Sequence, residues 1–136
     1  MITILRLAGL LHLGLIWAGA TMPRVVGLRQ HLAGTPEFIR RLVWVYYACI
    51  GLCLAGFGAI SLFLAGDLAS GTPLARAVCG LLCGFWTIRL VAALFVLDVR
   101  PYLTRPLLRL GYHATNAVFV LLPVVYGWAA LGACSP

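Results

Sequence analysis

Four long apolar stretches dominate this sequence, and each is long enough to cross the hydrocarbon core of a lipid bilayer as a helix. A spanning helix needs about 20 predominantly apolar residues, and the stretches cover about residues 2–22, 42–64, 74–97 and 107–131. The chain is 63% hydrophobic and 10% charged, whereas soluble domains average about 45–50% apolar and about 25% charged residues. We therefore predict an all-α integral membrane protein, a single antiparallel bundle of four transmembrane helices over residues 1–136.

The first stretch shares features with a secretory signal peptide. Arg6 precedes an apolar run that ends in the small residues 18–20, which is the order of regions in such a peptide. The run is longer than the apolar core of a signal peptide, which has about 7–15 residues. We expect this stretch to be retained as the first helix.

Threonine–proline pairs mark the start of two helices. Thr35 and Thr72 each stand before a proline, Pro36 and Pro73. A threonine side chain can cap a helix, and proline suits the first helical position because its missing N–H would be unpaired there. By the same argument the fourth helix begins near Pro106.

The charges indicate how the chain is oriented. All ten cations are arginines, and they flank the apolar stretches instead of clustering on one polar face as in nucleic-acid-binding proteins. We predict no nucleic-acid partner, but a lipid bilayer with anionic headgroups. The positive-inside rule places the two arginine-rich loops in the cytoplasm and both termini outside it, in a multi-pass protein of the inner (plasma) membrane. These loops hold Arg24, Arg29, Arg40, Arg41, Arg100, Arg105 and Arg109, against Arg6 and Arg76 on the other side.

Arg89 lies in the middle of an apolar stretch, whereas Arg6, Arg76 and Arg109 lie near the ends of theirs. A charge at the centre of a spanning helix costs about 2.5–3.5 kcal/mol on insertion scales and usually marks a functional site. Asp98 follows nine residues later, which places it on the opposite helix face. Asp67 and Glu37 are expected at the two membrane surfaces, so no carboxylate is expected at the depth of Arg89.

Counting along the four helices places several polar side chains near the depth of Arg89. We predict a polar pocket in the cytoplasmic half of the bundle that binds an amphipathic, anionic small molecule or lipid, in a carrier or a small membrane enzyme. A guanidinium group suits an anion because it stays charged and donates two parallel hydrogen bonds. The structural alternative is that Arg89 only joins helices through hydrogen bonds. The predicted ligand-binding residues are Arg89, Asn116, His113, Tyr47, His12 and Trp86.

Two further function classes remain open. The chain could be a structural or haem-carrying electron-transfer subunit of a larger membrane complex, because helix bundles hold cofactors between facing side chains. On the depth count, however, His113 lies about two turns closer to the cytoplasm than His12, a poor geometry for two ligands of one iron. The chain could also be a small oligomeric transporter or channel. No P-loop or HExxH motif occurs, and whether the protein is an enzyme is left open.

Small residues and cysteines have simpler interpretations. Gly80 and Gly84 have the spacing that lets helix backbones approach closely, so we expect them to pack against a small-residue face of the second helix or against a second copy of the chain. The four cysteines of the second and third helices are expected at two different depths. They are therefore interpreted as small buried hydrophobic residues, and no metal site is predicted.

Overall fold

The computed structural model describes residues 1–96 and 105–132, and these contain six helices and no strands. The four long ones are α1 (Ile2–Val25), α3 (Glu37–Phe63), α5 (Pro73–Phe95) and α6 (Pro106–Ala130), and the short α2 (Leu28–Leu32) and α4 (Ala65–Leu68) lie in the connections. All four long helices are long and apolar enough to cross a membrane. The fold is therefore an all-α four-helix membrane bundle, as predicted. Asp98, Arg100 and the predicted end of the third span at residue 97 lie outside the described residues.

The helix starts show how the sequence sets the element boundaries. Pro73 is the first residue of α5, and the Thr72 side chain accepts a hydrogen bond of 3.3 Å from the Ala75 N–H, as predicted. At α3 the prediction was wrong by one residue, because Pro36 itself is the N-cap. The Thr35 hydroxyl instead donates to the Leu32 carbonyl oxygen at 2.8 Å. Thr35 therefore closes the end of α2 and does not cap α3.

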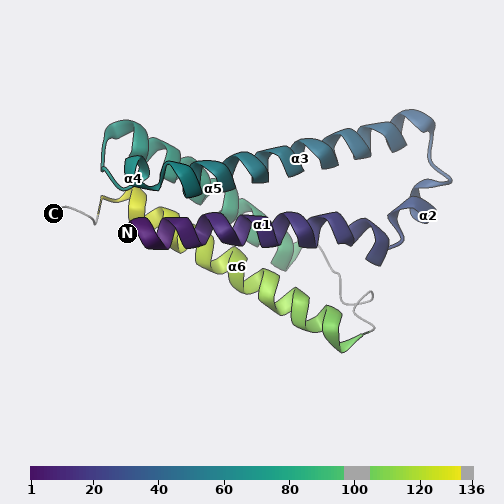
Figure 1. Ribbon diagram of the computed structural model, residues 1–136. Helices are drawn as coiled ribbons and strands as arrows, with labels where there is room; N and C mark the ends of the chain where they lie inside the picture. The colour runs from purple at the N-terminus through teal and green to yellow at the C-terminus, as the bar shows by residue number, and fades with distance from the viewer. Residues whose placement is uncertain (97–104, 133–136) are drawn as a thin grey trace.

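The long helices alternate in direction, and their packing order follows the contacts between them. α1 packs against α3 on one side and α6 on the other, and α5 packs against α6. The beginning of α1, the short α4 and the end of α6 lie together at one end of the molecule (Figure 1). We call this the terminal end, and the opposite end, where α2 lies and α6 begins, the arginine-rich end. α2 and the beginning of α6, which belong to the two predicted arginine-rich regions, thus share one end.

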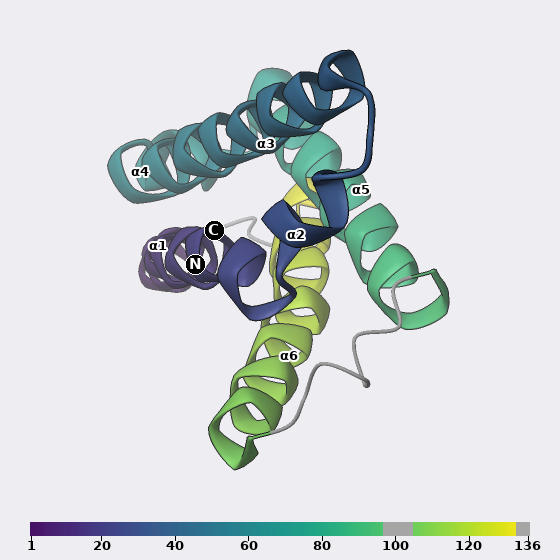
Figure 2. The same cartoon turned by 90° about the vertical axis from the view of Figure 1, so that its right-hand side faces the viewer.

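The helices do not run parallel. They lie close together at the terminal end and diverge towards the arginine-rich end, where α3, α5 and α6 point in different directions (Figure 2). The core is formed mainly by α1, α5 and α6. Their fully buried large side chains include Leu5, Leu82, Trp86, Leu122 and Tyr126. By contrast, α3 contributes only Gly58 and Ser61 as buried residues. Most of the α3 surface is left to face lipid.

Candidate ligand-binding site

One polar or aromatic side chain from each long helix meets in the core. His12 of α1, Ser61 of α3, Trp86 of α5 and Tyr126 of α6 are each no more than 1% exposed. The hydroxyl oxygens of Ser61 and Tyr126 are 2.6 Å apart and form a hydrogen bond. The His12 ring contacts the rings of Trp86 and Tyr126 edge-on, with centroids 5.2 Å and 6.2 Å away. We call these four side chains the central layer.

The hydrogen bond of His12 fixes which ring nitrogen carries the proton. Nδ1 of His12 lies 2.7 Å from the carbonyl oxygen of Ala8, one turn earlier in α1. A carbonyl oxygen can only accept, so Nδ1–H is the donor, and in the neutral ring Nε2 is left as a bare acceptor. Nε2 of His12 and Nε1–H of Trp86 are both buried and have no hydrogen-bond partner among the described residues.

Arg89 lies beside the central layer but does not join it by hydrogen bonds. Its guanidinium carbon is 5.5 Å from the centroid of the Phe119 ring, and Phe119 in turn packs on Trp86 at 5.6 Å. The side chain of Arg89 is exposed. In the described part of the chain it has no carboxylate partner.

The remaining predicted site residues are dispersed. The Tyr47 hydroxyl donates to the carbonyl oxygen of Gly19 and so joins α3 to α1. Asn116 is half-buried on α6, and His113 is exposed, with its ring 5.4 Å from that of Tyr112. His12 and His113 therefore have different surroundings, one enclosed by aromatic rings and one at the surface. Of the six predicted residues, the structure brings His12 and Trp86 into contact and places Arg89 next to them through Phe119.

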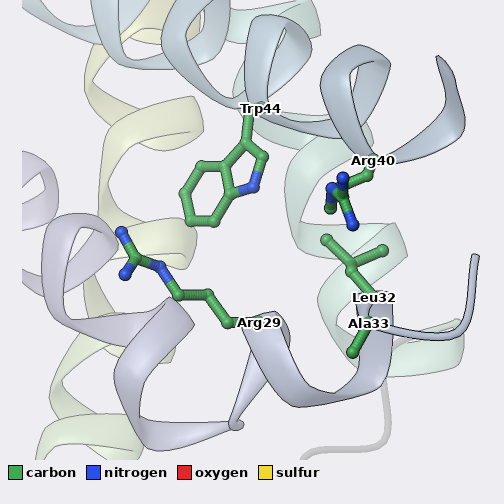
Figure 3. A pocket seen from close by; sticks show the side chains of 5 residues that line it. All are labelled: Arg29, Leu32, Ala33, Arg40 and Trp44. Atoms are coloured by element: carbon green, nitrogen blue, oxygen red, sulfur yellow. The ribbon is translucent and has the colours of Figure 1, made fainter. Parts of the chain in front are cut away.

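A pocket at the arginine-rich end was not anticipated as a site. It lies between α2 and α3 and has a volume of about 510 Å³. Figure 3 shows the Trp44 ring reaching down from α3, with the side chains of Arg29 and Arg40 on either side of it. The guanidinium carbon of Arg29 is 5.9 Å from the centroid of the Trp44 ring. The pocket is lined by Arg29, Leu32, Ala33, Arg40 and Trp44, and we call it the arginine pocket.

The arginine pocket contains positive charge without a balancing carboxylate. Glu37, the acidic residue closest in sequence, pairs with Arg41 at 2.5 Å, one turn along α3. Neither Arg29 nor Arg40 has a carboxylate partner among the described residues. The two guanidinium groups are therefore free to bind an anion from outside the chain.

Part of this pocket could have been found in the sequence. Arg40 and Trp44 are four residues apart, so they lie on one face of α3. The other half depends on α2, which places Arg29 opposite α3. This short helix follows Gly27, whose φ of 61° is a left-handed conformation that glycine adopts at little cost. The sequence contains no periodic signal for a helix of five residues, so the fold-back of α2 was missed.

No family model matches this sequence, and no curated protein or solved structure is similar to it at a significant level.

Proposed function

We propose that this membrane protein binds an anionic amphiphile in the arginine pocket, as a lipid carrier or a small membrane enzyme. The observation that supports this proposal is that Arg29 and Arg40 both line one pocket, on either side of Trp44, and that the lining residues include no acidic side chain. A guanidinium group donates hydrogen bonds to phosphate or carboxylate in a planar fork. Two such groups on one pocket suit a phosphate or carboxylate headgroup.

The apolar part of the lining favours an amphiphile over a simple ion. Leu32, Ala33 and the Trp44 ring provide nonpolar surface next to the two guanidinium groups. Indole rings are favoured at headgroup depth because one edge is polar and the remainder is apolar. A molecule with an anionic head and an acyl or prenyl chain would use both parts of the pocket.

The length of α3 supports a location at the membrane surface. Its 27 residues correspond to about 40 Å of helix, which exceeds the hydrocarbon core of about 30 Å. The additional turns extend into the headgroup region, and Glu37, Arg40 and Arg41 are the charged residues of α3. In the proposed orientation the N-terminal end of α3 faces the cytoplasm, and the protein lies in the inner membrane of the cell. The ligand then comes from the cytoplasmic leaflet.

Lipid binding to purified protein tests the proposal. The wild type and an Arg29→Gln/Arg40→Gln variant are titrated with phosphatidylglycerol and phosphatidylcholine in detergent, and bound lipid is counted by native mass spectrometry. The expected result is a preference for phosphatidylglycerol in the wild type that falls at least about tenfold in the variant, because each charge-assisted hydrogen bond contributes about 1.5–3 kcal/mol.

A second double variant controls for the loss of charge. Arg24 and Arg105 are exposed arginines near the same end, and neither lines the pocket. Arg24→Gln/Arg105→Gln should retain most of the preference for phosphatidylglycerol. An equal loss in both double variants would show that the preference comes from net charge alone, which would contradict a defined binding site.

A further inference from the structure

Two orphaned nitrogens lie at the contact between His12 and Trp86. Nε2 of His12 is an acceptor, because its Nδ1–H donates to the Ala8 carbonyl oxygen. Nε1–H of Trp86 is a donor and can only donate. The two rings touch, with centroids 5.2 Å apart and planes inclined by 78°. The core thus contains one unpaired acceptor and one unpaired donor in the same small region.

The neighbouring side chains do not supply a partner for either nitrogen. The hydroxyl groups of Ser61 and Tyr126 are bonded to each other at 2.6 Å. Phe85 and Phe119 pack on Trp86 with ring centroids 5.4 Å and 5.6 Å away, and they offer no hydrogen-bonding side-chain atoms. Buried polar groups in native proteins are nearly always paired, with protein atoms or with ordered water. Neither nitrogen has such a partner among the described residues, so a group from outside the chain would satisfy both.

We infer that His12 and Trp86 together form a binding site for one hydroxyl oxygen. A hydroxyl group accepts from the Trp86 N–H through its lone pair and donates its own proton to Nε2 of His12. A ketone has no proton to donate and an ammonium group has no lone pair, so neither satisfies both nitrogens. This site is separate from the arginine pocket and does not depend on the function proposed for that pocket.

The hydroxyl can come from two sources. One source is a buried water molecule, which in proteins typically makes about three hydrogen bonds to otherwise unpaired polar groups. The other is a long-chain alcohol from the bilayer. An apolar groove of about 310 Å³ lies between α3 and α5 and is lined by Phe57, Ile60, Ala77, Val78, Leu81 and Leu82.

Aromatic contacts connect this groove to the orphaned nitrogens. The ring of Phe57, in the groove lining, packs edge-on against Phe85 at 5.0 Å, and Phe85 packs against Trp86 at 5.4 Å. Leu82 of the groove is one turn before Trp86 on α5, so both lie on the same face of that helix. A chain lying in the groove would have its hydroxyl end separated from His12 by these two phenyl rings.

Solid-state NMR of the full chain in bilayers tests the inference. Histidine and tryptophan side chains are isotope-labelled in the ring nitrogens, and the protein is reconstituted in dioleoylphosphatidylcholine, which has no hydroxyl group. Once the hydroxyl source is present, we expect Nε2 of His12 and the indole N–H of Trp86 to show hydrogen-bonded chemical shifts, with magnetisation transfer from a hydroxyl proton to both. If the source is water, the transfer disappears in deuterated water and is unaffected by added farnesol.

If the source is an alcohol, transfer to the two nitrogens appears only after farnesol is added, and the methyl ether of farnesol does not produce it. Trp86→Phe removes one of the two groups that hold the hydroxyl, so the chemical shift of His12 Nε2 should move towards that of an unbonded nitrogen. Trp17→Phe should leave this shift unchanged. Trp17 is the matched control because it is a tryptophan that is 73% exposed. The wild-type spectrum is decisive even if Trp86→Phe does not fold.

Two results would overturn the inference. The first is a His12 Nε2 signal at the chemical shift of an unbonded nitrogen, without transfer from any hydroxyl proton under either condition. The second is transfer from the indole N–H of Trp86 directly to Nε2 of His12, which would show that the two nitrogens are each other's partners.

Discussion

Arg89 illustrates how one charged residue is accommodated in an apolar helix. It lies six residues before Phe95, the last residue of α5, which corresponds to about 9 Å along the axis. An arginine side chain is shorter than this, so its stem can bring the charged group only part of the way towards the headgroups. The ring of Phe119 covers part of the guanidinium at 5.5 Å. The charge is thus met by a ring face, and it has no carboxylate partner among the described residues.

Replacing Arg89 should therefore have a small effect on stability. We expect Arg89→Leu to change the free energy of unfolding by no more than about 1 kcal/mol, because an exposed cation–π contact is worth about 0.5–1 kcal/mol. Thermal unfolding in detergent measures the effect, with Arg105→Leu as an exposed control. A loss of about 3 kcal/mol or more for Arg89→Leu alone would mean that Arg89 holds a buried polar network together.

The hydrogen bond between Ser61 and Tyr126 should show strong coupling. Ser61→Ala or Tyr126→Phe alone leaves one buried hydroxyl unpaired, which costs about 1–3 kcal/mol. The double variant removes both groups and should be less destabilised than the sum of the two single variants. Unfolding free energies for the four members of this double-mutant cycle measure the coupling. Additive losses would show that the two hydroxyl groups do not depend on each other.

At the scale of the helices, glycines determine how closely α1 and α3 approach. A Cβ atom placed on Gly9 would lie 2.6 Å from Cγ of Leu62 and 3.1 Å from the carbonyl oxygen of Gly58. A Cβ atom on Gly58 would lie 3.0 Å from Cβ of His12. The two backbones therefore touch next to His12. This crossing positions the histidine against the residues of α5 and α6.

Alanine substitutions at two glycines of α1 should have opposite signs. Gly9→Ala should destabilise the bundle by about 1–3 kcal/mol through overpacking. Gly14→Ala should be neutral or stabilising by up to about 1 kcal/mol, because nothing lies within 4 Å of its Cβ position and alanine is the better helix former. Thermal unfolding of both variants under one condition checks the prediction. Equal effects would contradict a close crossing at Gly9.

Features that depend on residues close together in the sequence could be predicted, and features that depend on distant residues could not. Apolar stretches and proline positions are local, and they predicted the four spans to within a few residues and the start of α3 to within one residue. The residues that determine which helices pack together are far apart in the sequence. Gly80 and Gly84 have the close-packing spacing, yet both are exposed and nothing lies within 4 Å of their Cβ positions. The close crossing uses Gly9 and Gly58, which no short-range pattern distinguishes from the other glycines.

The same distinction applies to the candidate site. The depth count put His12 and Trp86 among the candidate site residues, because depth follows from residue number and helix rise, and in the structure their rings are in contact. It could not determine the rotation of each helix, and so it did not predict that Tyr47 would bond to Gly19 on α1. Nor did it show that His113 would face outward. Ser61 and Tyr126 were missed because the packing of four helices brings them together.

For the whole molecule, the exposed face at Gly80 and Gly84 is the surface that the sequence predicts to pack against either the second long helix or a second copy of the chain. Because these glycines contact nothing within the described chain, Gly80→Leu and Gly84→Leu should leave the stability of the monomer nearly unchanged. If the face joins two copies, both variants should lower the dimer fraction seen by native mass spectrometry, whereas Gly66→Leu in α4 should not. A dimer fraction equal to that of the wild type in both variants would exclude this face as the interface.

The orientation of the molecule in the membrane decides which leaflet the arginine pocket meets. The arginine-rich and terminal ends are opposite (Figure 1), and the positive-inside rule assigns the arginine-rich end to the cytoplasm.

Single cysteines are introduced at Gln30, in α2, and at Ser70, after α4, in a background from which the native cysteines have been removed. Both positions are exposed. An impermeant thiol reagent added to intact cells should label the Ser70 variant, whereas the Gln30 variant should react only after the membrane has been opened. Labelling of Gln30 and not of Ser70 in intact cells would reverse the orientation, and the anionic ligand would then have to come from the outer leaflet.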